Sequence, residues 1–214
     1  MGLRSILRNV VNSLEEAIGA QAERSAGEVV CGIQIAALFR CAADVVSESP
    51  SANLADQMEI ASQKLIEMEN NLSAQIYASG LAEFARVFRE QNISLKDLVE
   101  YIRYFLHEPE GWAGPKPARS DETLKALVIA LGRWKRQEKN HLVRTPDIST
   151  LFDLGIIYLQ ARQKGGRKID NIAEAAVQAS PLRELPSSLY YDRIAVKALL
   201  EALSSEGSAT QAAS

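Results

Sequence analysis

The sequence has few of the residues and patterns on which most enzymes depend. Two cysteines and two histidines occur among 214 residues, so a cluster of metal ligands has few nitrogen and sulfur donors available. Neither the Gly-x-Ser-x-Gly turn of serine hydrolases nor the Gly-x4-Gly-Lys phosphate loop is present. These absences predict a protein without a metal site and without a cofactor, and they exclude the enzyme classes that those two motifs identify.

Disulfide bonds and membrane spans are not expected either. Cys31 and Cys41 lie ten residues apart in one apolar helical segment, which separates them by roughly 15 Å and puts them beyond disulfide reach. No uninterrupted apolar run reaches the length of a membrane span. The N-terminal segment has Arg4 and Arg8 but lacks the apolar core of a signal peptide. We therefore expect a cytoplasmic protein with reduced cysteines and no membrane span.

Apolar residues at helical spacing are abundant. They recur at intervals of three and four, the period of an α-helix that buries one face. The clearest stripes are Leu3, Ile6, Leu7, Val10, Val11, Leu14, Ala17 and Ile18; Leu95, Leu98, Val99, Ile102, Phe105 and Leu106; and Leu124, Leu127, Val128, Leu131 and Trp134. Trp134 falls on the third stripe and is expected to pack inward. The pattern predicts an all-α fold, a compact bundle of about eight helices.

Helix-breaking and capping residues predict where these helices begin and end. We expect helices over 3–21, 27–46, 54–89 with an interruption near Asn70–Asn71, from Ser94 with Asp97 completing a capping box, from a capping Ser120, and over 145–163, 170–179 and 187–203. The segment 27–46 is apolar nearly all round, which is typical of a helix at the centre of a core.

The segment 108–119 is the best candidate for a domain boundary, because its three prolines and two glycines cannot continue a helix. It would join an acidic helical lobe over 1–107 to a basic helical lobe over 120–203, followed by a disordered tail over 204–214. Residues 1–108 carry 9 basic and 15 acidic side chains, a net of −6, and residues 109–214 carry 15 and 12, a net of +3. This asymmetry indicates two surfaces with different partners, although ordinary compositional scatter gives similar numbers.

Basic residues of the second lobe form two clusters that could bind nucleic acid. A stripe of positive charge beside helices is the usual footprint of phosphate recognition. The candidates are Arg133, Arg136, Lys139 and Arg144 in the first cluster, and Lys164, Arg167 and Lys168 beside Gly165–Gly166 in the second. The alternative is structural, because both clusters are expected at helix C-termini, where basic side chains complement the macrodipole.

The segment Arg136–His141 resembles the Arg-x4-His motif of the helical HEPN ribonucleases. The resemblance covers six residues in an all-helical context. It implies that Arg136 and His141 of two subunits would face each other across a dimer and cleave RNA. A solvated basic helix end gives the same spacing and is the simpler interpretation.

Trp112, inside the Pro/Gly-rich segment, either fills the protein's own core or anchors a partner. Our first hypothesis is a non-catalytic helical subunit that acts through protein contacts in a larger assembly. A nucleic-acid-binding helical module that uses the basic second half is the alternative. The sequence does not predict an oligomeric state.

Overall fold

The computed structural model describes residues 2–20, 25–50, 52–68, 71–107, 115–137, 167–185 and 187–205. Within these ranges the chain forms eight α-helices and one short 3-10 helix, and it forms no strand. The prediction of an all-α bundle of about eight helices is therefore confirmed. The helices are α1 Leu3–Gly19, α2 Ala26–Ser47, α3 Leu54–Ile66, α4 Leu72–Glu90, α5 Leu95–His107, α6 Ser120–Gln137, α8 Lys168–Ala179, the 3-10 helix η1 Pro181–Glu184 and α9 Leu189–Ser205.

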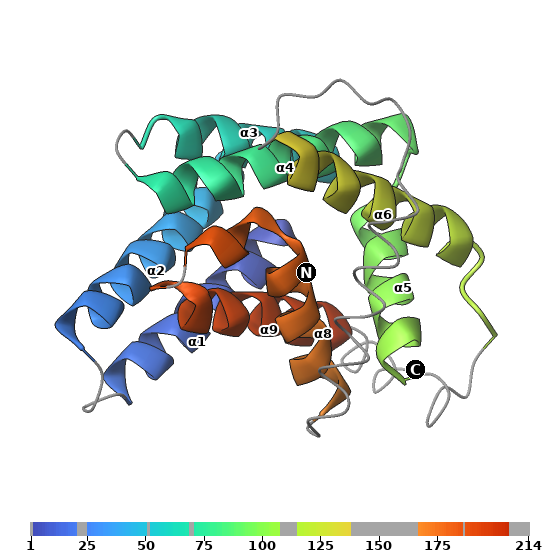
Figure 1. Cartoon of the computed structure of the whole chain (residues 1–214). Coiled ribbons are helices and arrows are strands. Elements are labelled where there is room, and N and C mark those ends of the chain that lie inside the picture. The colour runs from blue at the N-terminus through green and yellow to red at the C-terminus, as the bar shows by residue number, and fades with distance from the viewer. Residues whose placement is uncertain are drawn as a thin grey trace.

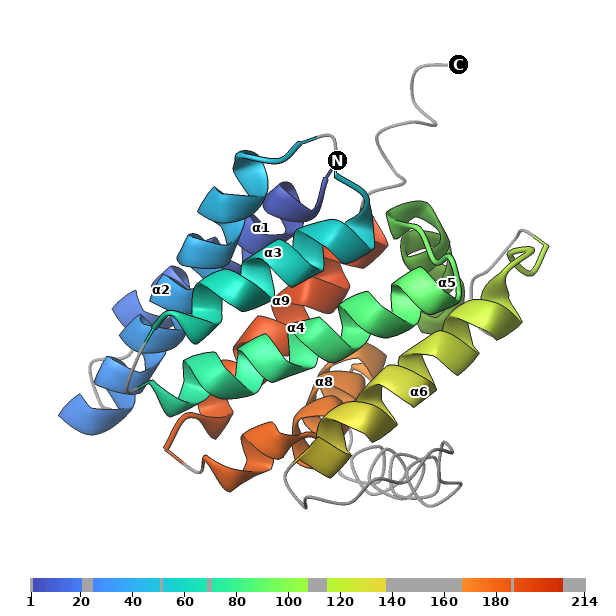
Figure 2. The ribbon, with the colours of Figure 1, turned by 90° about the horizontal axis from the view of Figure 1, so that it is seen from above.

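The helices form two layers that are closed at both sides (Figure 1). α3, α4 and α6 make the upper layer, α1, α8 and α9 lie below it, and α2 and α5 flank the two layers. Seen from above, α3, α4 and α6 run side by side with α8 and α9 beneath them (Figure 2). α9 packs against α1, α8 and α5, and less extensively against α2. It is therefore the central helix of the bundle.

Side-chain caps explain most of the helix starts. Asn71 accepts a hydrogen bond from the backbone of Ala74 at 3.0 Å and begins α4, so the expected interruption of the 54–89 segment is a complete break between two helices. Ser94 and Asp97 exchange the expected capping hydrogen bonds at the start of α5. Ser25 and Glu28 make a capping box at the start of α2, a signal that the sequence contained and that we had not used.

Three helix ends differ from expectation. The Ser120 hydroxyl does not cap α6 but donates to the carbonyl of Pro117 at 2.8 Å, because the preceding turn already supplies acceptors to the helix start. α8 begins at Lys168, two residues earlier than expected, with Arg167 at the N-cap. α9 continues through Ser205, where its last turn still packs on the core. The expected helix over 145–163 lies outside the described residues.

One main core joins helices from both sides of the 108–119 segment. It contains the α1 stripe, the inner residues of α2 to α5, Ala126 and Ala130 of α6, and Tyr191 and Ala195 of α9. Both predicted lobes thus contribute to the same apolar interior. Independent folding of 1–107 and of 120–203 stays a prediction.

Two glycines allow the closest helix contacts. A Cβ atom on Gly32 of α2 would lie 2.7 Å from the ring of Tyr191, and one on Gly80 of α4 would lie 2.8 Å from the indole of Trp134. Trp134 packs inward as predicted, with 8% of its surface exposed. Its Nε1 donates to the carbonyl of Ile76 and to Ser79 Oγ, both at 3.1 Å.

The inner face of α6 is shifted from the stripe that its leucines predicted. Leu127, Leu131 and Trp134 of that stripe pack against the cores. Leu124 is 43% exposed, whereas Thr123, Ala126 and Ala130 are fully buried. The small side chains at these positions let α6 approach α4 and α5 closely, which moves the centre of the buried face away from Leu124.

α2 is not the central helix that its composition predicted. It lies at one side of the bundle, packed on α1 and α3, and Val30 and Ile33 are 51% and 53% exposed. Among the described residues, α2 is also the one helix long and apolar enough to cross a membrane, with 44% of that apolar window buried. Core helices of soluble proteins and signal sequences share this length and composition. Our expectation had required an uninterrupted apolar run, and α2 carries Arg40 and Asp44 within its window.

Candidate functional site

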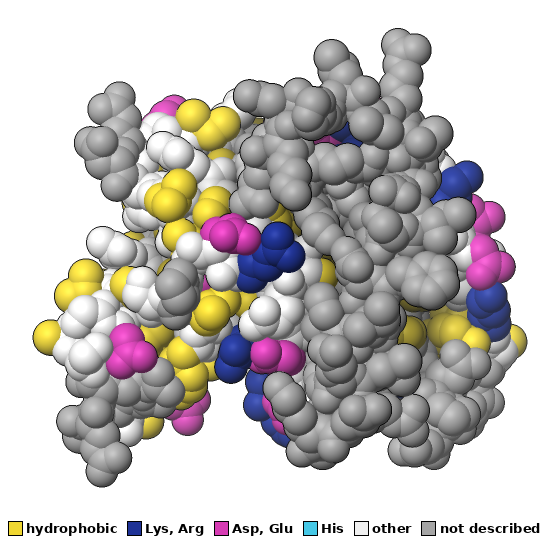
Figure 3. All heavy atoms as spheres, in the orientation of Figure 1, with side chains coloured by type: hydrophobic (Ala, Val, Ile, Leu, Met, Phe, Trp, Pro, Cys, Tyr) yellow, Lys and Arg dark blue, Asp and Glu magenta, His cyan; other side chains and the backbone are white. Residues whose placement is uncertain are grey.

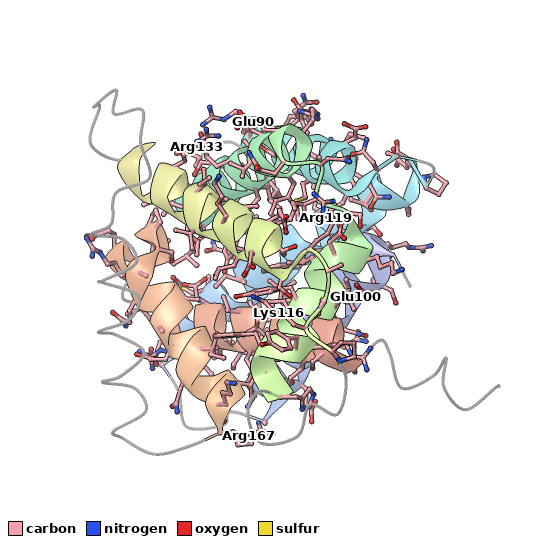
Figure 4. All side chains as sticks on the ribbon, turned by 90° about the vertical axis from the view of Figure 1, so that its right-hand side faces the viewer. Glu90, Glu100, Lys116, Arg119, Arg133 and Arg167 are labelled. Carbon is pink, nitrogen blue, oxygen red and sulfur yellow. The ribbon has the colours of Figure 1, made fainter. Side chains whose placement is uncertain are left out.

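The described basic residues of the second half do not come together. Figure 4 shows the face formed by α5, α6 and α8, with Arg133 and Arg167 at its opposite ends. Arg133, near the C-terminal end of α6, donates to Glu90 of α4 at 3.1 Å and is 30% exposed. The positive charge of Arg133, a predicted phosphate-binding residue, is thus neutralised by a carboxylate of the same protein.

Arg167 belongs to a network of charges between α8 and α9. It lies 3.1 Å from Asp170 and 3.6 Å from Glu201, and Asp170 also binds Lys197 at 2.7 Å. Burial acts to raise the pKa of Asp170, but the hydrogen bonds from Lys197 and Arg167 outweigh it and hold the pKa below its usual value. The two basic and two acidic groups cancel, so the network fastens the start of α8 to the end of α9.

Lys168 is also engaged within the fold. Its Nζ donates to the carbonyl of Phe105 and lies 5.0 Å above the centre of the Phe105 ring. Arg167 and Lys168 lie at the start of α8 rather than at a helix C-terminus, so the macrodipole does not favour them. Asp170 in the first turn of α8 supplies the compensating charge.

The other predicted site residues are not part of the described structure. Arg136 lies in the last turn of α6, where no side-chain position is described. Lys139, His141, Arg144, Lys164 and Trp112 lie outside the described ranges. The ribonuclease pair Arg136 and His141, the nucleic-acid stripe and the partner-anchoring role of Trp112 therefore stay predictions.

Arg119 shows how the 108–119 segment joins the bundle. Its guanidinium donates to the carbonyls of Asn92 and Gln91 and lies 3.2 Å from Asp97. Asn92 has a φ of 50°, the left-handed conformation that ends α4 and leaves these carbonyls free to accept. Lys116 binds Asp121 at 2.6 Å close by (Figure 4). The end of this segment is thus fixed by hydrogen bonds and ion pairs to α4, α5 and α6.

A buried polar group that the sequence did not reveal joins α4 to α9. Tyr77 Oη donates to Asp192 Oδ1 at 2.7 Å, and Ser188 Oγ donates to Asp192 Oδ2 at 2.7 Å. Asp192 is fully buried, and burial raises its pKa to about 6 in spite of the two hydrogen bonds that lower it. Tyr77 and Asp192 are 115 residues apart in the chain, so no local pattern could have predicted their hydrogen bond.

In the described part of the chain, neither the Tyr77–Asp192–Ser188 group nor His107 has the arrangement of a known catalytic site. His107 is the exposed last residue of α5. Among the described residues, no group of three or more histidines, cysteines and acids is placed to hold a metal ion. A cleft of about 630 Å³ lies beside the start of α1, but Arg8 in that cleft is already paired with Asp44 at 2.5 Å.

The most unusual surface is the exposed side of α2. Val30, Ile33, Ala37 and Cys41 follow one another along the helix on one side and run for roughly 16 Å. At the Cys41 end this side meets the turn between α3 and α4, where Cys41 and Met68 pack on the same small cluster. Ile66 ends α3 and Leu72 begins α4, and they are 61% and 58% exposed. We name the surface formed by Val30, Ile33, Ala37, Cys41, Ile66, Met68 and Leu72 the α2 outer face.

Figure 3 shows hydrophobic side chains reaching the surface on this side of the molecule. Four of the six large apolar side chains that are exposed in the described structure belong to the α2 outer face. Cys31 and Cys41 are both free, and burial raises the pKa of the Cys41 thiol against a smaller opposite effect of Lys64. Cys41 therefore contributes a neutral, apolar thiol to the face.

The charged residues beside the α2 outer face are of both signs. Asp44, Lys64 and Glu67 surround Cys41, and Arg40 is paired with Glu15 of α1. The sequence signal for this surface was present, because 27–46 was apolar nearly all round. We had interpreted that pattern as a helix buried on every side.

Comparison of the chain with protein-family models, with curated proteins and with solved structures finds no match.

Proposed function

We propose that the protein is a non-catalytic helical subunit that acts through protein contacts, and that the α2 outer face is its contact surface. The observation that carries the proposal is in α2: the helix is apolar nearly all round, but the fold covers one side of it and leaves Val30 and Ile33 exposed. Contiguous exposed apolar side chains usually mark an interaction site, because leaving them in water is unfavourable.

The pattern of side-chain sizes favours a second copy of the chain as the partner. Large residues lie at both ends of the face, Val30 and Ile33 at one end and Ile66 and Leu72 at the other, with the small Ala37 between them. Two copies related by a two-fold axis near Ala37 would bring the large end of one against the opposite end of the other. Such self-complementary pairing is the commonest way in which soluble chains associate.

The charges beside the face argue against a membrane surface as the partner. Anionic lipids attract clusters of free Lys and Arg, whereas Arg40 and Lys64 are each paired with a carboxylate of the same chain, Glu15 and Glu67.

The test is the oligomeric state of the full chain, measured by analytical ultracentrifugation over a wide concentration range. We expect a dimer that dissociates on dilution, and Ile33→Asn is expected to shift the equilibrium to monomer. Leu124→Asn is the matched control, because Leu124 is an exposed leucine-size side chain on a different helix. A chain that stays monomeric, or a dimer that Ile33→Asn leaves unchanged, would overturn the proposal. Sedimentation with phosphatidylcholine–phosphatidylserine vesicles by a monomeric chain would point to a lipid surface instead.

The nucleic-acid hypothesis receives no support from the described basic residues, since Arg133, Arg167 and Lys168 all have partners within the fold. Reversing Arg136 and Lys139 to Glu and measuring RNA binding at two salt concentrations tests what is left of it. A cytoplasmic location is part of the same proposal, and the two free cysteines support it.

A further inference from the structure

A partly open apolar cavity lies between the two layers of the bundle. Its volume is about 320 Å³, and every described α-helix contributes to its wall. The largest contributions come from α4 above, with Leu81, Phe84 and Phe88, and from α9 below, with Val196 and Leu199. Engineered apolar cavities of about half this volume stay dry and bind benzene. An empty cavity becomes more destabilising as its volume grows, so a space of this size favours an occupant.

The polar atoms of the wall are all engaged within the protein. Tyr77 Oη donates to Asp192, Trp134 Nε1 donates to the Ile76 carbonyl and to Ser79, and Ser180 Oγ donates to the Val177 carbonyl at 2.9 Å. The remaining side chains of the described wall are aliphatic, thioether or phenyl groups. Ordered water needs two to four polar partners, and these three polar side chains leave too few free positions to hold one.

Rigid aromatic contacts hold the cavity open. Phe39 and Tyr77 meet edge to face with ring centres 5.2 Å apart, and Phe84 and Phe88 do so at 5.8 Å. Tyr77 is held at its hydroxyl by the buried Asp192, and Trp134 is packed against Gly80. None of these rings can turn into the space without breaking a hydrogen bond or a packed contact, so the site is formed before a ligand arrives.

We propose that this cavity is a binding site for a small neutral apolar molecule. Its volume is roughly twice that of the engineered cavity that binds benzene, so a two-ring hydrocarbon is of suitable size. A charged or strongly polar ligand is excluded, because its polar group would lose its hydration and find no hydrogen-bond partner. Half-buried wall side chains occur on several helices, among them Leu81 of α4, Leu131 of α6 and Leu199 of α9; α6 and α8 are seen from outside in Figure 4.

Naphthalene is a suitable probe, and decanoate is the charged comparison of the same carbon number. Trp134 lines the cavity, so its fluorescence in the Trp112→Phe variant reports binding directly. We expect naphthalene to change this fluorescence with saturation and to raise the Tm in proportion to the logarithm of its free concentration. Decanoate should bind about tenfold or more weakly.

Two substitutions fill the cavity from opposite walls. Ala42→Leu on α2 and Ala176→Leu on α8 place additional carbon atoms in the space that the ligand needs, and each is expected to weaken naphthalene binding about tenfold or more. Ala82→Leu is the matched control, since Ala82 is a half-buried alanine of α4 outside the cavity wall. The site is refuted if naphthalene changes neither fluorescence nor Tm of the folded protein, or if both filled variants that fold cooperatively bind it as well as the control does.

Discussion

α1 and α2 pack against each other as one hairpin, yet their sequences relate to burial in opposite ways. The apolar residues of α1 from Leu3 to Leu14 form one stripe, and all six are at most 7% exposed. α2 is apolar nearly all round, but Val30 and Ile33 remain more than half exposed. A one-sided pattern names the face that the fold covers. An apolar pattern nearly all round the helix predicts that every side is covered. It does not indicate whether the covering residues belong to the same chain or to a partner.

The largest expected effect compares one side chain from each helix. Leu14→Ala in α1 removes a fully buried side chain and should lower the free energy of unfolding by about 2–5 kcal/mol. Ile33→Ala in α2 should change it by less than about 0.5 kcal/mol when the protein is dilute enough to be monomeric. Urea denaturation measures both. Equal losses would show that the α2 outer face is covered within a single chain, and the distinction between the two helices would fail.

The second prediction concerns Asp192 of α9. The neighbouring residue, Tyr191, packs against Gly32 on the inner side of α2. The pKa of Asp192 is raised to about 6 from a usual value of 3.8 because the carboxyl group is buried. Between these two pH values the folded protein holds a proton that the unfolded chain releases, so stability falls as the pH rises. The loss amounts to about 3 kcal/mol. Asp192→Asn should remove this dependence, as urea denaturation at a series of pH values would show.

Asp170→Asn provides a control of opposite sign. The pKa of Asp170 lies below its usual value, so its ion pairs stabilise the protein above the usual pKa and are lost as the pH falls below it. Replacing Asp170 should therefore leave the change between pH 4 and 6 intact. The prediction fails if the wild-type protein and Asp192→Asn show the same change in stability between pH 4 and 6, because Asp192 would then not hold a proton in the folded state.

The third prediction uses two glycines of α2 that face different surroundings. A Cβ atom on Gly32 would lie 2.7–2.9 Å from the Tyr191 ring, whereas one on Gly27 would have no atom within 4 Å. Gly32→Ala should therefore cost about 1–3 kcal/mol through overpacking. Gly27→Ala should stabilise α2 by up to about 1 kcal/mol through its better helix propensity. The Tm of both variants tests the difference between the side of α2 that packs on α9 and the exposed start of the helix. A higher Tm for Gly32→Ala would contradict the close approach of α9.

The sequence predicted what depends on neighbouring residues and missed what depends on distant ones. The stripe of α1, the break at Asn71 and the capping pair Ser94–Asp97 are local, and each agrees with the structure. The predicted inner face of α6 was right for Trp134 and wrong for Leu124, because close helix contact places the small Ala126 and Ala130 at its centre, which an apolar pattern does not single out. The helix class was thus accessible from periodicity, and the packing within it was not.

The same division applies to the candidate sites. Arg133 looked like a free positive charge because its partner, Glu90, lies on another helix. Arg167 has one partner on another helix, Glu201, and a local one, Asp170, that the sequence analysis did not use. Tyr77 and Asp192 gave no signal at all, and the cavity beside Tyr77 is assembled from every described α-helix. The α2 outer face did give a signal, an excess of apolar residues. From the sequence this excess predicted a central helix, and only the fold showed that one side of α2 is exposed.

The smallest expected effects compare the starts of the two helices. α2 begins with a capping box from Ser25 and Glu28, whereas α1 begins at Gly2 with no side-chain cap. Ser25→Ala removes an acceptor for the Glu28 backbone and should cost about 1 kcal/mol. Gly2→Ser supplies the missing acceptor and should stabilise α1 by a few tenths of a kcal/mol. Hydrogen exchange of the first-turn amides resolves changes of this size helix by helix. Because the caps act locally, Ser25→Ala should speed exchange at the start of α2 and leave α1 unchanged, and faster exchange in both helices would mean that the hairpin opens as one unit.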